Sequence, residues 1–133
     1  RDVFKGTSLT GSMLASAAKK TYETTGMFVP LELALSQAQF ETSMGRKGRN
    51  PATNPFNVGE YDEGTKIKFK NIREGINSYY KLMANDYLKT KPIDKLLTDF
   101  TNFRGNRYAS DPLYEQKISG QMNFIRNFFQ KGE

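Results

Sequence analysis

The sequence predicts a mainly α-helical domain, α+β in the sense that it carries one small β element. Apolar side chains recur at helical spacing in five stretches, whereas one short stretch alternates polar and apolar residues. The 133 residues, 37% of them hydrophobic, suffice for one core, so we expect a single domain over residues 1–133. Because the chain begins at Arg1 and lacks a signal-peptide pattern, we expect a domain excised from a larger chain.

Two helices are predicted in the first third of the chain. The first runs from about Thr10 to Thr24, with apolar residues on one face, and Gly26 ends it. The second begins at Pro30, a favourable first helical position, and Gly45 ends it. This second helix is the most apolar of the five.

A long loop and a hairpin are predicted next. Residues 45–64 are rich in Gly, Asn and Pro and show no periodicity, which indicates a loop. A loop of this length in a small domain is usually either functional or disordered. The alternation over Thr65–Lys70 predicts a strand that pairs with the stretch around Val58–Tyr61.

Three further helices complete the prediction, and each has a recognisable start. Asn71, with Glu74 three residues later, has the form of a capping pair. Pro92 opens the fourth helix and Asp111-Pro112 opens the fifth. The apolar stripes of these helices are Ile72, Ile76, Tyr79, Tyr80, Met83 and Tyr87; then Ile93, Leu96, Leu97 and Phe100; and then Tyr114, Ile118, Met122, Ile125 and Phe129.

The composition limits the catalytic chemistry that the chain can perform. Without cysteine or histidine, thiol nucleophiles, histidine bases and Cys/His zinc sites are excluded, so we expect carboxylate chemistry with no cofactor and no metal. The 20 basic and 14 acidic residues give a charge of +6, which suits an anionic partner such as bacterial cell wall. The basic clusters at residues 46–49 and 66–70 either hold anionic groups or form a solvated surface. We expect no nucleic acid and no membrane insertion.

Glu41 is the leading catalytic candidate. It falls on the apolar side of the second helix, three residues after Ala38 and four after Gln37, in the last turn before the long loop. Partial burial there would raise the pKa of the carboxyl group, so that it keeps a proton to donate near neutral pH. The alternative is a salt bridge from Glu41 to Arg46 or Arg49.

Three motifs resemble the flagellar and autolysin glucosaminidases of glycoside hydrolase family 73. The residues A-L-S-Q-A-Q-F-E-T-S-M-G at 34–45 are similar to the family's A-L-A-Q-A-x-x-E-[ST]-x-[WF]-G. The loop N-P-F-N-V-G at 54–59 loosely resembles N-x-L-F-G-I-K, and R-Y-A-S-D-P-L-Y at 107–114 resembles Y-A-T-D-P-x-Y. The chain departs from the pattern at Met44, Pro55 and Asn57, which puts subsite shape and bond preference in doubt.

The resemblance implies a lysozyme-like helical fold with a small β-lobe and assigns roles to residues. Glu41 would be the catalytic acid, and Tyr108 would line the cleft and contact N-acetylglucosamine, unless it is a core tyrosine. Glycosidases ordinarily use a second carboxylate, although the substrate's acetamido group can replace a nucleophile. The candidates for it lie in the predicted hairpin turn, where Glu60 is favoured. The predicted substrate contacts are Tyr108, Phe56, Asn54, Gln37, Asp62 and Glu63.

The resulting functional prediction is a peptidoglycan hydrolase that cleaves the β-1,4 bond after N-acetylglucosamine. A lytic transglycosylase on the same fold is one alternative, and a non-catalytic wall-binding or virion structural domain is another. The expected partner is the peptidoglycan glycan strand, together with other subunits of a phage tail or a larger parent chain. The expected location is the extracellular or periplasmic cell wall, or the phage virion.

Overall fold

The computed structural model describes residues 7, 9–42, 53–56, 58 and 69–131. Within them the chain is mainly helical, as predicted, and contains five α-helices. These are α1 (Gly11–Thr25), α2 (Leu31–Thr42), α3 (Ile72–Leu82), α4 (Ile93–Leu96) and α5 (Tyr114–Lys131), with a π-helical segment η1 (Met83–Leu88) continuing α3. The bridge between Thr101 and Arg107 is the sole β pairing in these residues.

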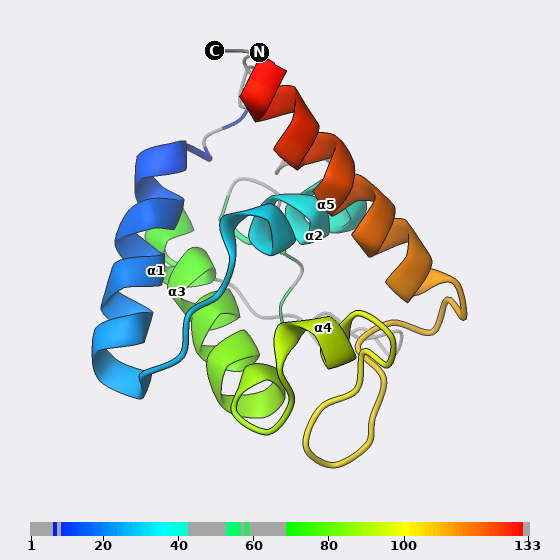
Figure 1. Cartoon of the computed structure of the whole chain (residues 1–133). Coiled ribbons are helices and arrows are strands. Elements are labelled where there is room, and N and C mark those ends of the chain that lie inside the picture. Colours follow the sequence, from blue (N-terminus) through cyan, green and yellow to red (C-terminus); the bar gives the residue numbers. More distant parts are fainter. Residues whose placement is uncertain (1–6, 8, 43–52, 57, 59–68, 132–133) are drawn as a thin grey trace.

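Helix α2 lies at the centre of the domain. Figure 1 shows α1 and α3 side by side, with α5 on the opposite side of α2. The closest helix pairs are α2 with α5 and α1 with α3. Because α2 is covered from both sides, residues 33–38 are all buried, which explains why this helix has the most apolar sequence. None of the described helices is both long and apolar enough to cross a membrane.

Local sequence determines where the helices start and stop. The Thr10 hydroxyl accepts a hydrogen bond from the Met13 amide at 3.2 Å and caps α1. Gly26 ends α1 in the left-handed conformation with φ 76°, where glycine is unstrained. The predicted capping pair at α3 is confirmed: the Asn71 side chain accepts from the Glu74 amide at 3.0 Å, and Glu74 accepts from the Lys70 amide at 2.9 Å.

The fourth predicted helix is wrong in length. Helix α4 ends at Leu96, and Phe100, expected on its apolar stripe, lies in the core outside any helix. The Thr98 hydroxyl donates to the Lys95 carbonyl at 2.8 Å and so competes for a helical acceptor. The Phe100 amide donates to the Glu115 carboxylate at 2.8 Å instead of to a carbonyl one turn back. A local bond from Thr98 and a long-range bond to Glu115 therefore take the place of further helical hydrogen bonds.

Much of the predicted loop and hairpin, residues 43–52, 57 and 59–68, lies outside the described residues. The described segment 53–56 packs tightly on α3 at Gly75. A Cβ atom at Gly75 would lie 2.0 Å from the Thr53 carbonyl oxygen, so only glycine permits this approach. The contact brings the segment up against α2 and α3.

Candidate active site

Glu41 lies half-buried in the last turn of α2, among three tyrosines from different parts of the fold. Tyr79 comes from α3, Tyr108 from the segment between α4 and α5, and Tyr114 from the first turn of α5. The Glu41 carboxylate helps to raise the pKa of each of these three hydroxyl groups, although burial is the larger cause in every case. The fold therefore gathers one carboxyl group and three protonated phenols.

Gln37, one turn before Glu41, connects two of the tyrosines. Its side chain is fully buried, its amide nitrogen donates to the Tyr114 hydroxyl at 3.1 Å, and its amide oxygen accepts from the Tyr79 hydroxyl. Tyr114 in turn shares a side-chain hydrogen bond with Glu41, one of the causes of the raised pKa of Tyr114. A chain of hydrogen bonds thus runs from Tyr79 through Gln37 and Tyr114 to Glu41.

Tyr108 belongs to an aromatic cluster that holds its ring in place. The ring stacks on Tyr114 with centroids 5.7 Å apart and an interplanar angle of 18°. It also meets Phe100 at 5.3 Å and Tyr87 at 5.5 Å, both edge to face. The side chain is half-buried, so part of it stays accessible beside Glu41. The predicted contact between Tyr108 and a sugar ring stays a prediction.

An ion pair fixes the segment that carries Tyr108. Arg107 donates to both carboxylate oxygens of Glu115, at 2.8 and 2.9 Å, and to the carbonyls of Ala109 and Asp111 at 3.1 and 2.9 Å. The hydrogen bond from Arg107 is the main reason that the pKa of Glu115 falls from 4.5 to about 2. The pair ties Tyr108 to the start of α5.

Residues 53–56 and 58 contact the end of α2 and the Tyr79 ring of α3. Both side-chain atoms of Asn54 bond the backbone of Val58, each at 3.0 Å, which forms a tight turn. Phe56 stacks on Tyr79 with ring centroids 3.7 Å apart. The Thr42 hydroxyl, one residue after Glu41, donates to the Pro55 carbonyl. These contacts join the end of α2 to the turn.

The structure brings part of the predicted site together. Gln37, Asn54 and Phe56 are buried, Gln37 and Phe56 both contact Tyr79, and Tyr108 lies near Glu41. That these four contact substrate stays a prediction. The acidic candidates Glu60, Asp62 and Glu63 lie outside the described residues, as do Arg46 and Arg49.

Sequence reasoning missed three of the residues that shape the site. Tyr79 and Tyr114 were expected only as core positions on helical stripes, and the ion-pair partner Glu115 was not singled out at all. Tyr114 does end the motif R-Y-A-S-D-P-L-Y, which was an available indication of a role beyond packing. Among the described residues no group of three or more acidic side chains is placed to hold a metal.

The described site thus consists of a partly buried carboxyl group beside three tyrosine hydroxyls on a mainly helical domain. Residues 15–127 match the Glucosaminidase family, described as mannosyl-glycoprotein endo-beta-N-acetylglucosaminidase. The chain belongs to this family of glycosidases, which confirms the predicted family. The match includes Glu41 and all three tyrosines. Comparisons with curated proteins and with solved structures gave no match.

Proposed function

We propose that this protein hydrolyses the β-1,4 bond after N-acetylglucosamine in peptidoglycan, with Glu41 as the general acid. The observation that carries the proposal is the position of Glu41, half-buried among three tyrosines in a chain of the Glucosaminidase family. In this role Glu41 donates a proton to the leaving glycosidic oxygen. The family suggests the glycan strand as substrate.

The hydrogen bonds around Glu41 support this role by orienting the carboxyl group. Tyr114 is itself fixed by the buried Gln37 amide, so its hydroxyl meets Glu41 from a defined direction. An acid that transfers a proton in a transition state must lie within hydrogen-bond reach of the leaving atom, and a fixed orientation provides this. We propose that the buried side chains of Gln37, Asn54 and Phe56 support the residues that line the site, whereas Tyr108 faces the sugar.

The second catalytic group is proposed from the sequence. Glu60 is our first candidate, with Asp62 and Glu63 as neighbours that could serve instead or bind substrate. Attack by the substrate's own acetamido group is the alternative, and it needs no second carboxylate. The variant Glu60→Gln distinguishes these two mechanisms. Turnover should fall by two or more orders of magnitude only if Glu60 is catalytic.

The proposed place of action is the bacterial cell wall, outside the membrane or in the periplasm. The net charge of +6 favours approach to an anionic polymer. The phage virion and partnership with tail subunits stay predictions from the sequence.

The decisive variant is Glu41→Gln, assayed by the clearing of purified cell walls. We expect turnover to fall by two or more orders of magnitude with an unchanged melting temperature, since general acid catalysis contributes roughly 10²–10⁴-fold. Glu32→Gln is the matched control, because Glu32 lies on the same helix but pairs with Arg126 at 3.3 Å. Unchanged wall clearing by Glu41→Gln would reject Glu41 as the acid.

Product analysis distinguishes the hydrolase from a lytic transglycosylase on the same fold. Hydrolysis after N-acetylglucosamine leaves a reducing N-acetylglucosamine end, whereas a transglycosylase leaves an anhydromuramic end. Mass spectrometry of soluble wall fragments identifies these ends. An anhydro product would overturn the proposed reaction while leaving the role of Glu41 as a proton donor intact.

A further inference from the structure

A recess lies at the other end of α2 from Glu41. It has a volume of about 390 Å³, within the range of small-molecule sites, and is formed by α1, the connection to α2 and the start of α2. Leu31 opens α2 and lines the recess, whereas Glu41 lies ten residues later, about 15 Å along the helix axis. The lining residues are Leu14, Ala15, Ala18, Lys19, Tyr22, Phe28, Val29, Leu31 and Tyr80.

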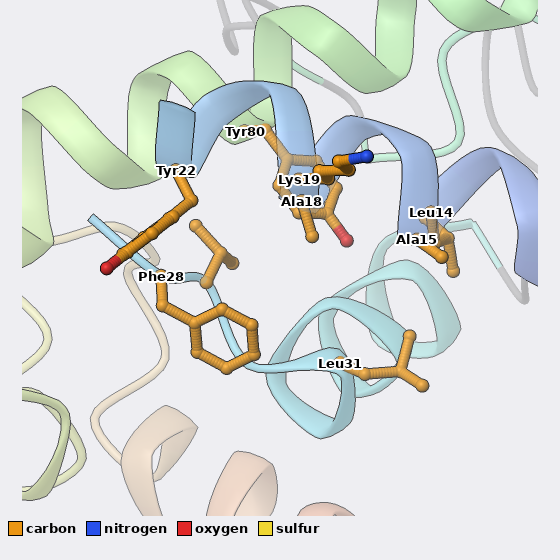
Figure 2. Close-up of a pocket in the computed structure, with 9 residues that line it drawn as sticks. Leu14, Ala15, Ala18, Lys19, Tyr22, Phe28, Leu31 and Tyr80 are labelled. Carbon is orange, nitrogen blue, oxygen red and sulfur yellow. The ribbon is translucent and has the colours of Figure 1, made fainter. Parts of the chain in front are cut away.

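The rim of this recess exposes large apolar side chains. Tyr22, Phe28 and Leu31 are 56%, 62% and 43% exposed, and they are three of the seven large hydrophobic residues that are exposed in the described part of the chain. Figure 2 shows Tyr22 and Phe28 at one side of the opening and Leu31 at the other. A gathering of exposed aromatic and aliphatic groups around a recess is typical of a binding surface.

The inner wall holds a hydroxyl group that has no hydrogen-bond partner. Tyr80 reaches in from α3, and its hydroxyl points into the space between α1 and α2 (Figure 2). Among the described residues, this is the one buried side-chain polar atom without a partner. Burial also raises the pKa of Tyr80, so the hydroxyl keeps its proton and can donate. A buried donor without an acceptor is costly and favours any ligand that supplies one.

We propose that this recess is an accessory binding site for an N-acetylated amino sugar, separate from the catalytic site. The apolar C–H face of such a sugar fits against the aromatic rim formed by Tyr22 and Phe28. Its acetamido methyl group fits the apolar wall, and its acetamido carbonyl supplies the acceptor that Tyr80 lacks. Lys19 and the Tyr22 hydroxyl lie at the rim, where they can form hydrogen bonds with the sugar hydroxyls that face outward.

This chemistry distinguishes the sugar from a simple hydrocarbon ligand. An alkyl chain would cover the apolar wall but would leave the Tyr80 hydroxyl without an acceptor. The class of sugar rests on the proposed function, since the family acts on bonds of N-acetylglucosamine. Such a site would hold the enzyme on its polymeric substrate between cleavage events. Because the hydroxyl is buried, the lining must shift slightly when the ligand binds.

The test is an NMR titration of the Glu41→Gln chain with the β-1,4-linked trisaccharide of N-acetylglucosamine. We expect saturable shifts at the backbone amides of residues 15–31, distinct from any shifts near Tyr108 that report the catalytic site. The trisaccharide of glucosamine, which lacks the acetyl groups, should leave residues 15–31 unshifted. Since binding is measured without turnover, failure of this site and failure of the catalytic proposal give different results.

Two substitutions examine the contacts directly. Phe28→Ala and Tyr80→Phe should each weaken trisaccharide binding at this recess about tenfold, by removing the stacking ring and the donor respectively. Phe124→Ala is the matched control, because Phe124 is also 62% exposed but lies on α5. Absence of shifts at residues 15–31, or unchanged affinity in both variants, would overturn the proposal. Shifts with decanoate but not with the trisaccharide would also overturn it, in favour of an acyl ligand.

Discussion

The residue that best explains how the site is held is Gln37. Its amide nitrogen donates to the Tyr114 hydroxyl, and its amide oxygen accepts from the Tyr79 hydroxyl. Both tyrosines are therefore fixed relative to α2. A buried amide bonded on both sides defines the direction of each phenolic hydroxyl. Glu41 is one turn further along the same helix and therefore meets a Tyr114 hydroxyl that is already oriented.

Tyr114→Phe tests whether this orientation matters for the reaction. The variant removes a hydrogen-bond donor from Glu41, which favours the protonated carboxyl group. Activity of a general acid declines as pH rises and its proton is lost, so the alkaline limb of the pH–rate profile should move to higher pH. We also expect a stability loss of about 1–2 kcal/mol, because the Gln37 amide loses its acceptor.

Tyr80→Phe is the control for Tyr114→Phe. Its hydroxyl has no hydrogen-bond partner among the described residues, so its removal should leave the pH–rate profile on soluble substrate unchanged and the melting temperature equal or higher. A Tyr114→Phe enzyme with the wild-type profile would show that the hydrogen bond to Glu41 has no part in setting the protonation of the acid.

At the scale of elements, the close approach of residues 53–56 to α3 joins the loop side of the site to the helical core. The segment is fixed by Gly75 beneath Thr53, by the stack of Phe56 on Tyr79, and by the bond from Thr42 to the Pro55 carbonyl. Each contact joins it to an element that also contributes to the Glu41 cluster. The position of the segment and the geometry of the site are therefore coupled.

Gly75→Ala should break this coupling. Glycine within a helix normally costs about 1 kcal/mol relative to alanine, so substitution elsewhere in a helix is favourable. Here the new Cβ would lie 2.0 Å from a backbone oxygen that cannot rotate away, and we expect a net destabilisation of about 2–3 kcal/mol. Turnover should also fall, because the segment bearing Phe56 must move. Chemical denaturation and wall clearing measure the two effects.

Gly120→Ala is the matched control on α5. A Cβ there meets nothing within 4 Å, so we expect the free energy of unfolding to rise by up to about 1 kcal/mol and turnover to stay the same. If Gly75→Ala were as stable as Gly120→Ala, the packing of residues 53–56 on α3 would be wrong.

At the scale of the whole molecule, the Arg107–Glu115 pair links the irregular segment before α5 to the core. The carboxylate also accepts the Phe100 amide, so one side chain joins the Tyr108 segment, the core aromatic and α5. Glu115 is 8% exposed, and removing its carboxylate would leave the Phe100 amide without its acceptor and Arg107 without its ion-pair partner. This pair should therefore affect global stability, unlike the more exposed pairs on the surface.

The pH dependence of unfolding should reveal the pair. The pKa of Glu115 is lowered from 4.5 to about 2 in the folded chain, so the unfolded chain binds this proton first as the pH falls. The stabilisation is complete above about pH 4.5 and is lost progressively towards pH 2. Glu115→Gln should lower the free energy of unfolding at neutral pH by about 2–3 kcal/mol. It should also reduce the loss of stability between pH 4.5 and pH 2. Melting temperatures from pH 7 to pH 2 measure both effects.

Glu23→Gln, at an exposed position on α1, is the control for that series. It should reproduce the wild-type acid step, because its carboxylate makes no ion pair with the described residues. If wild type and Glu115→Gln lost stability in parallel between pH 4.5 and pH 2, the ion pair would not be the source of the acid sensitivity.

The amino-acid sequence alone predicted most of the helices and the leading catalytic candidate, Glu41. Caps and stops depend on neighbouring residues, so Thr10, Gly26 and Asn71 could be predicted from local patterns. Apolar periodicity placed Glu41 on the inner face of α2, and the motif around it indicated the family that the comparison confirms. The length of α4 could not be predicted, because the Phe100 amide is bound by Glu115, fifteen positions away.

Only the tertiary structure decided which side chains surround Glu41. Periodicity shows which face of a helix is buried, but it does not show which buried faces meet. Gln37 bonds Tyr79 and Tyr114 across separations of 42 and 77 residues, and these pairings depend on how α2, α3 and α5 pack. The same packing directs the adjacent Tyr79 and Tyr80 to different places: Tyr79 bonds Gln37 in the cluster around Glu41, and Tyr80 lines the recess between α1 and α2.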